Sequence, residues 1–109
     1  MIKDSDGRMY FGFWNDMPYR TKSDKFEDFT GYKNTVSKND IINYMDSLSP
    51  ALACAFSKDM FTGAVFNAGI YWDGPFTFPV DFLRYYKTQD IGIPYEYEEY
   101  LKGILKTSK

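Results

Sequence analysis

The chain has 109 residues, the length of one domain, and we expect a single globular unit over residues 1–109. Hydrophobic residues make up 44% and charged residues 26%, a balance that excludes an intrinsically disordered chain. The 13 basic and 15 acidic residues give a net charge of -2. No basic stretch stands out along the sequence, which argues against a nucleic-acid-binding protein.

The aromatic content is unusually high. Ten Tyr, ten Phe and two Trp make up 20% of the chain, too many rings for a domain of this size to bury completely. We therefore expect some tyrosines at the surface, where their amphipathic rings suit contacts with other proteins.

The single cysteine and the start of the chain bear on where the protein works. Cys54 excludes an intramolecular disulfide, and its apolar neighbours predict a small buried residue rather than a reactive thiol. Residues 1–6 lack the apolar segment of a secretory signal, and no apolar run approaches the length that crosses a membrane. We expect a cytoplasmic protein.

The first elements in chain order are a strand, a long loop and a helix. The aromatic stretch 8–14 predicts a strand. Residues 15–34 are polar, but four interspersed aromatic rings predict a loop pinned to the body of the domain. A helix over 38–48 follows from the N-capping residue Ser37 and from apolar residues at helical spacing, and Ser49-Pro50 ends it.

Two strands and a tight turn come next. The apolar run 51–57 predicts a buried strand, with a helix as the alternative, and 64–72 predicts a second strand. Asp73-Gly74-Pro75 is the clearest turn signal of the chain, and 76–78 is the candidate for a brief returning strand.

Two proline-initiated helices complete the chain. Pro79 suits the first position of a helix over 79–87, and Pro94 begins a helix over 94–105 in the same way. The resulting fold class is α+β: a small, mainly antiparallel sheet with about three helices packed on one face. The predicted core comprises Phe11, Phe13, Ile41, Met45, Leu48, Leu52, Phe56, Phe66, Ile70, Phe82, Leu83, Leu101 and Leu105.

Catalytic chemistry is poorly supported. The chain has no histidine, which removes the commonest general acid and base and most zinc sites, and no phosphate-binding or dinucleotide-binding glycine motif occurs. We expect no catalytic residue, cofactor or metal. The carboxylates Asp59, Asp73 and Asp81 adjoin turns or helix starts, where Asp is favoured on backbone grounds. A carboxylate enzyme or ligand-binding domain stays open only if two of them converge in a cleft.

Two aromatic segments are candidates for a surface that binds a partner protein. Trp72 and Phe76 flank the turn, where rings can point outward. In the segment 95–100, Glu96 and Glu99 share one helix face, and tyrosines lie beside them. The predicted partner-binding residues are Trp72, Phe76, Tyr95, Glu96, Glu99 and Tyr100, with the 15–34 loop as a flanking contributor.

A run in the second half of the chain carries a resemblance. It consists of Asp73-Gly74, Phe76, Phe78-Pro79, Phe82-Leu83, Tyr85-Tyr86, Ile93-Pro94, Glu96-Tyr97 and Leu101. Together with the preceding helix and strands, at roughly residues 37–105, it resembles small uncharacterised bacterial proteins, some of them similar to toxin-immunity proteins. The resemblance implies a compact α+β protein that neutralises a partner, and it carries over no catalytic residue.

The expected function is that of a non-catalytic protein-binding module, of the inhibitor or immunity type. Frequent Lys, Asn, Tyr and Ile suggest an A+T-rich coding sequence, which is common in phages and mobile elements. The partner would then be a toxin or a host defence enzyme. Self-association and the alternative of nucleic-acid binding, through Arg20, Lys22, Lys25, Lys33 and Lys38, are left open.

Overall fold

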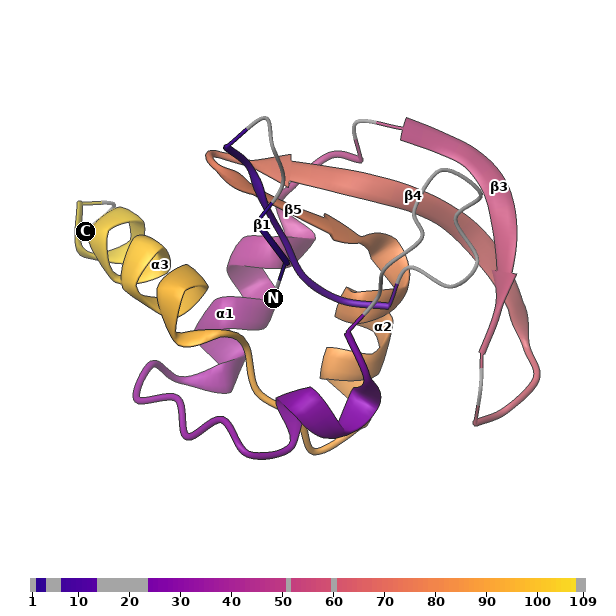
Figure 1. Cartoon of the computed structure of the whole chain (residues 1–109), viewed down its shortest axis with the longest axis horizontal. Coiled ribbons are helices and arrows are strands. Elements are labelled where there is room, and N and C mark those ends of the chain that lie inside the picture. The colour runs from indigo at the N-terminus through magenta and orange to yellow at the C-terminus, as the bar shows by residue number, and fades with distance from the viewer. Residues whose placement is uncertain (1, 4–6, 14–23, 51, 60, 108–109) are drawn as a thin grey trace.

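The computed structural model describes residues 2–3, 7–13, 24–50, 52–59 and 61–107 (Figure 1). Within these ranges the chain forms strands, a short 3-10 helix (η1) and three α-helices. Their bounds are β1 Ile2–Lys3, β2 Met9–Tyr10, η1 Phe26–Phe29, α1 Lys38–Asp46, β3 Leu52–Lys58, β4 Val65–Asp73, β5 Phe76–Pro79, α2 Val80–Thr88 and α3 Tyr95–Thr107.

The strands form one mixed sheet in the order β1-β2-β5-β4-β3. β3 pairs antiparallel with β4, and β4 with β5 through the tight turn around Gly74. Gly74 has a φ of +57°, a left-handed conformation that favours glycine, and this explains the strong turn signal of the sequence. The brief returning strand after the turn is confirmed as β5.

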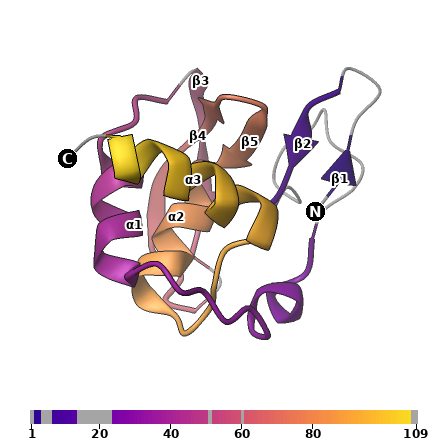
Figure 2. The same cartoon turned by 90° about the vertical axis from the view of Figure 1, so that its left-hand side faces the viewer.

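The three helices pack on one face of this sheet. In the β4–β5 register Tyr71 lies opposite Phe78 and Asp73 opposite Phe76, so these four side chains share a face. Tyr44 of α1 and Tyr97 of α3 both donate hydrogen bonds to Asp73, and Phe82 of α2 packs against Phe78. Figure 2 shows α1, α2 and α3 gathered together on that side, with β1 and β2 set apart from them. The predicted α+β class is confirmed.

The core is dominated by aromatic rings. Phe11 is fully buried, and its ring centroid lies 4.9 Å from that of Phe78 and 5.0 Å from those of Phe82 and Tyr97. Among the predicted core residues, those confirmed as buried are Phe11, Phe13, Ile41, Met45, Ile70, Phe82, Leu83 and Leu101. Leu48, Phe66 and Leu105 are half-buried, and the side chain of Leu52 lies outside the described part of the chain.

The prediction that Phe56 belongs to the core is wrong, because its side chain is 74% exposed. Its strand β3 is at the edge of the sheet, and the β3–β4 hairpin reaches beyond the helices (Figure 1). An apolar run predicts a strand but does not reveal whether a second layer covers it.

The predicted strand 8–14 is also wrong in extent, since only Met9–Tyr10 is β-structure. β2 runs parallel to β5 and antiparallel to the unpredicted strand β1. Gly12 has a φ of +108°, and a Cβ there would lie 2.8 Å from Pro79 Cδ. The chain therefore leaves the sheet at this point and carries Phe11 and Phe13 into the core. Trp14 lies outside the described residues.

The loop before α1 is tied to the body, as predicted, over its described residues 24–34. Phe29 of η1 is buried, and its carbonyl accepts a hydrogen bond from the backbone N–H of Gly92. The side-chain amide of Asn34 both donates to and accepts from the backbone of Ile93. Residues 15–23 of the predicted loop lie outside the described part.

In the described part of the chain, no helix is both long and apolar enough to cross a membrane.

Candidate functional site

Large apolar side chains lie at the surface in three places. The exposed fractions are 74% for Phe56, 68% for Val65, 61% for Trp72, 50% for Phe61 and 46% for Tyr95. Phe56, Phe61 and Val65 belong to the β3–β4 hairpin and its turn, Trp72 lies near the end of β4, and Tyr95 begins α3. Exposed rings of this size on an otherwise buried framework are typical of binding surfaces.

Trp72 lies on the sheet face opposite the helices, because its neighbours Tyr71 and Asp73 point toward them. The guanidinium carbon of Arg8 lies 5.4 Å from the centroid of the Trp72 ring. Arg8 is itself held in place, since its Nε donates to Thr77 Oγ1 at 2.9 Å and Nη2 donates to the carbonyl of Phe76 at 3.1 Å. The exposed indole is therefore supported by a fixed cation.

Phe76, predicted beside Trp72 at the surface, lies in the core instead. Its side chain is only 2% exposed, and its ring packs against Tyr97 at 5.1 Å and Tyr100 at 5.4 Å. The reason is the alternation of side chains along a strand. Phe76 is paired with Asp73 and faces the helices, whereas Trp72 faces away from them.

The predicted acidic segment of α3 is divided between surface and core. Tyr95, Glu96 and Glu99 are exposed, while Tyr100 is half-buried against Gly74 and Phe76. Tyr95 also has a structural role, because its hydroxyl accepts a hydrogen bond from the backbone N–H of Lys33 at 2.9 Å. Only part of the predicted surface is thus free to meet a partner.

Glu98, between these exposed residues, turns inward and is 4% exposed. The backbone N–H groups of Thr35 and Val36 donate to its Oε2 at 2.6 and 3.0 Å. Desolvation by burial opposes ionisation, but these donors outweigh it and hold the pKa of Glu98 below its ordinary value. Glu98 fastens the loop before α1 to α3.

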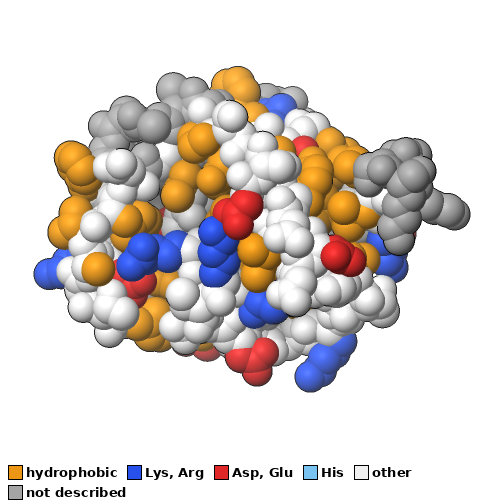
Figure 3. All heavy atoms as spheres, turned by 180° about the vertical axis from the view of Figure 1, so that it is seen from behind, with side chains coloured by type: hydrophobic (Ala, Val, Ile, Leu, Met, Phe, Trp, Pro, Cys, Tyr) orange, Lys and Arg blue, Asp and Glu red, His pale blue; other side chains and the backbone are white. Residues whose placement is uncertain are grey.

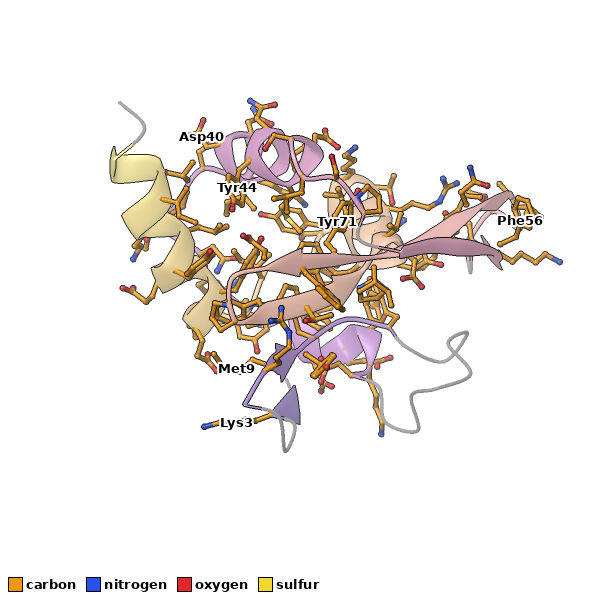
Figure 4. The ribbon with its side chains drawn as sticks, turned by 90° about the horizontal axis from the view of Figure 1, so that it is seen from above. Lys3, Met9, Asp40, Tyr44, Phe56 and Tyr71 are labelled. Atoms are coloured by element: carbon orange, nitrogen blue, oxygen red, sulfur yellow. The ribbon has the colours of Figure 1, made fainter. Side chains whose placement is uncertain are left out.

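The β3–β4 hairpin presents a surface that sequence reasoning missed. Phe56 pairs with Asn67 and Lys58 with Val65, so these four side chains share one face. Asn67 has the same parity as Tyr71 along β4, and both line the groove beside α2, while Phe66, of the opposite parity, contacts Arg84 of α2. Figure 4 shows Phe56 at the far end of the twisted hairpin, beyond α1 and α2.

A groove of about 370 Å³ lies at the base of the hairpin. Asn67 and Tyr71 of β4 form one side of it, and Leu83, Arg84 and Lys87 of α2 form the other. An ion pair between Lys87 and Asp46 of α1 lies at its margin. Figure 3 shows the molecule from behind the view of Figure 1, with basic and acidic side chains lying among apolar ones on that surface.

Asp59 organises the turn of the hairpin. Its carboxylate accepts hydrogen bonds from the backbone N–H groups of Phe61 and Thr62 at 2.7 and 2.9 Å, and Arg84 Nε lies 2.7 Å from its other oxygen. The bond from Arg84 is the main cause of a lowered Asp59 pKa. The guanidinium carbon of Arg84 also lies 4.6 Å from the Phe66 ring centroid, which fixes the hairpin to α2.

Asp73 accepts hydrogen bonds from three tyrosine hydroxyl groups. Its Oδ1 accepts from Tyr44 at 2.8 Å and from Tyr100 at 3.3 Å, and its Oδ2 accepts from Tyr97 at 2.8 Å. Burial, reinforced by the adjacent carboxylate, raises the pKa of Tyr97 and of Tyr44 far above the ordinary tyrosine value. The expected role of Asp73 as a simple turn residue is therefore incomplete, since it joins β4 to α1 and α3.

Asp59 and Asp73 do not converge. Asp59 lies beside Ala64, just before β4, whereas Asp73 is the last residue of β4, so the nine-residue strand separates them. The third carboxylate, Asp81, is buried in the first turn of α2. In the described ranges no group of three His, Cys, Asp or Glu residues is arranged to hold a metal ion.

No protein-family model matches the chain, and comparison with curated proteins and with solved structures gives no significant match.

Proposed function

We propose that this chain is a non-catalytic protein-binding module that neutralises another protein by occupying its surface. The observation that carries the proposal is the display of Trp72, Phe56 and Val65, each more than 60% exposed, on a framework in which most other large apolar side chains of the described residues are buried or half-buried. Exposing such side chains is unfavourable in water, and their burial by a partner would recover this free energy.

Three of the five buried carboxylates in the described residues support a binding role over a catalytic one. Asp59 holds a turn, Asp73 joins three elements, and Glu98 fastens a loop, so each accepts hydrogen bonds from the framework itself. A general acid or base needs to reach a substrate, and a carboxylate fully engaged in structural bonds is poorly placed for this.

Trp72 is the proposed anchor of the partner contact. Tryptophan contributes more binding energy at protein interfaces than most residues, especially when its conformation is fixed beforehand. The Arg8 guanidinium beneath the ring and the tight turn at Gly74 provide such fixation. Glu96 and Glu99 form a second, acidic region on α3 that would favour a basic partner, with Glu99 already paired to Lys102 at 3.0 Å.

The proposed partner is a toxin or a defence enzyme. The resemblance of residues 37–105 to small bacterial proteins similar to toxin-immunity proteins favours an inhibitor or immunity-type protein, acting on a toxin or a defence enzyme. The residue usage favours a phage or mobile-element origin, and the lone Cys54 favours action in the cytoplasm.

The test is an affinity pull-down. The tagged chain is used to capture proteins from cells that naturally contain this chain, and the retained proteins are identified by mass spectrometry. We expect one protein in stoichiometric amount. Trp72→Ala should then weaken its binding by about 2 kcal/mol or more in calorimetry. Glu96→Ala/Glu99→Ala tests the α3 region separately, and Lys33→Ala serves as an exposed control.

Near-UV circular dichroism must first show that each variant is folded. If both variants bind as tightly as the parent chain, the surface is misplaced. Retention of a nucleic acid or a small molecule without any protein partner would contradict the proposed function itself.

A further inference from the structure

We infer that the face of the β3–β4 hairpin beside α2 is a docking site for an acidic amphipathic helix of a partner protein. The inference rests on the proposed function and specifies a contact different from the one at Trp72, on the opposite face of the sheet.

The apolar part of this site is formed by Phe56 and Val65. They occupy adjacent strands on the same face as Asn67, which lines the groove beside α2, and they are 74% and 68% exposed. α2 covers β4 and β5 nearer the turn at Gly74, and the hairpin extends past it (Figure 4). The helical layer is therefore incomplete over the far end of the sheet.

The groove of about 370 Å³ continues this surface toward the body of the protein. Asn67 belongs both to the groove and to the face that carries Phe56. A ligand lying on the hairpin could thus insert a side chain between β4 and α2, against Tyr71 and Leu83. Contacts of this kind, with an apolar anchor in a pocket, concentrate binding energy.

The charges around the surface select the partner. Lys58 lies on the hairpin face, and Arg84 and Lys87 project from α2 along the groove. Arg84 pairs with Asp59, but the two side chains are not equally exposed. The side chain of Arg84 is 34% exposed and that of Asp59 only 4%, so more of the positive charge than of the negative charge is exposed to solvent. Asp46 offsets only Lys87. The three basic and two acidic residues of this face leave a net charge of +1, on a chain of net charge -2, and this excess positive charge complements an acidic partner.

The fold also favours a helix as the occupant. α2 packs on β4, and the adjacent position in the same layer, over β3, is where a further helix would lie at about 8–10 Å from α2. Its apolar stripe would rest on Phe56 and Val65, and acidic residues along its sides would approach Lys58 and Lys87. An extended peptide would instead use the backbone edge of β3.

The test uses two synthetic peptides as probes. Both are amphipathic helices with the same leucine stripe at i, i+3, i+4 and i+7, and the polar positions carry glutamate in one and lysine in the other. We expect the glutamate peptide to bind, to shift the backbone amide NMR signals of residues 56–58, 65–67 and 84–88, and to bind more weakly as salt is raised. The lysine peptide should bind at least tenfold more weakly.

Two double variants test whether lysine side chains of this face contribute to peptide binding. Lys58→Glu/Lys87→Glu should weaken binding of the glutamate peptide at least tenfold, while the matched control Lys3→Glu/Lys33→Glu, at exposed positions on β1 and on the loop before α1, should leave it unchanged. Phe56→Ser should abolish binding, and its exposed position leaves the fold intact. Trp72→Ala should have no effect.

Equal binding of both peptides, binding of neither, or NMR shifts confined to other elements would overturn the inference. So would self-association through this face, seen as a concentration-dependent mass in sedimentation that Phe56→Ser abolishes. A natural partner that binds through Trp72 alone would leave the proposed function standing without this site.

Discussion

Asp73 connects β4 to the two helices α1 and α3 through hydrogen bonds of its side chain. It ends β4, and its 6%-exposed carboxylate accepts three tyrosine hydroxyls from two helices. Hydrogen bonds to an ionised acceptor are stronger than neutral ones, and a buried carboxylate needs them to offset its desolvation. The same aspartate also forms the turn at Gly74, so one side chain sets both the local turn and the packing of distant helices.

We expect Asp73→Asn to lower the free energy of unfolding by about 2–4 kcal/mol, because the substitution removes the charge and places an amide donor among hydroxyl donors. Urea denaturation followed by far-UV circular dichroism measures this. The exposed Asp90→Asn is the matched control and should change stability by less than about 0.5 kcal/mol. Equal effects of the two substitutions would mean that the three tyrosines do not depend on the carboxylate.

At the scale of elements, α2 connects most parts of the fold. It follows β5 without a loop, with Pro79 as the residue before its first turn, and it packs against β4, β5 and α1. Phe82, Leu83 and Tyr86 form its inner face, as the helical spacing predicts. Arg84 on its flank holds the hairpin through Asp59.

Leu83→Ala should destabilise the protein by about 2–5 kcal/mol, since the side chain is 4% exposed and its truncation leaves a cavity. Val65→Ala truncates another aliphatic side chain in an exposed position and should cost less than about 0.5 kcal/mol. Urea melts of both variants compare them directly. A small effect of Leu83→Ala would show that the inner face of α2 is assigned incorrectly.

The contact between α3 and the loop before α1 should depend on pH. The pKa of Glu98 is lowered in the folded state, so its contribution to stability is present above the unfolded value near 4.5 and is lost as pH falls through the folded value. At neutral pH we expect Glu98→Gln to cost about 1 kcal/mol. The difference from the parent should shrink between about pH 5 and pH 3 in urea melts, whereas a constant difference would contradict a role of the charge.

For the molecule as a whole, the distribution of basic residues bears on the alternative of nucleic-acid binding. Of the predicted basic cluster, Lys25 and Lys33 are exposed, Lys38 is engaged with the carbonyl of Gln89 and the ring of Tyr86, and Arg20 and Lys22 lie outside the described residues. The described members do not combine into one free cationic surface.

We therefore expect no band shift with duplex DNA or single-stranded RNA at about 150 mM salt. The measurement is a gel-shift titration, with repetition at about 50 mM salt to reveal weak electrostatic binding. Tight binding that falls steeply with salt would favour the nucleic-acid alternative over the protein-binding module.

The sequence by itself determined the helices, the turn at Gly74 and eight of the 17 hydrophobic residues that are buried in the described part of the chain. Ser37, Pro79 and Pro94 mark helix starts, and apolar residues at a 3.6-residue period identify the inner faces, because both signals are local. The absence of histidine likewise removes the commonest general acid and base from the chain.

Only the tertiary structure decided which aromatic rings face solvent. Phe76 was expected outside and is buried, and Phe56 was expected inside and is exposed. On a strand, successive side chains point to opposite faces, so the register and the reach of the covering layer decide exposure. The hydrogen bonds from Tyr44, Tyr97 and Tyr100 to Asp73, and the groove beside α2, join residues far apart in the chain. Local spacing carries no signal for such contacts, because they depend on how the elements pack.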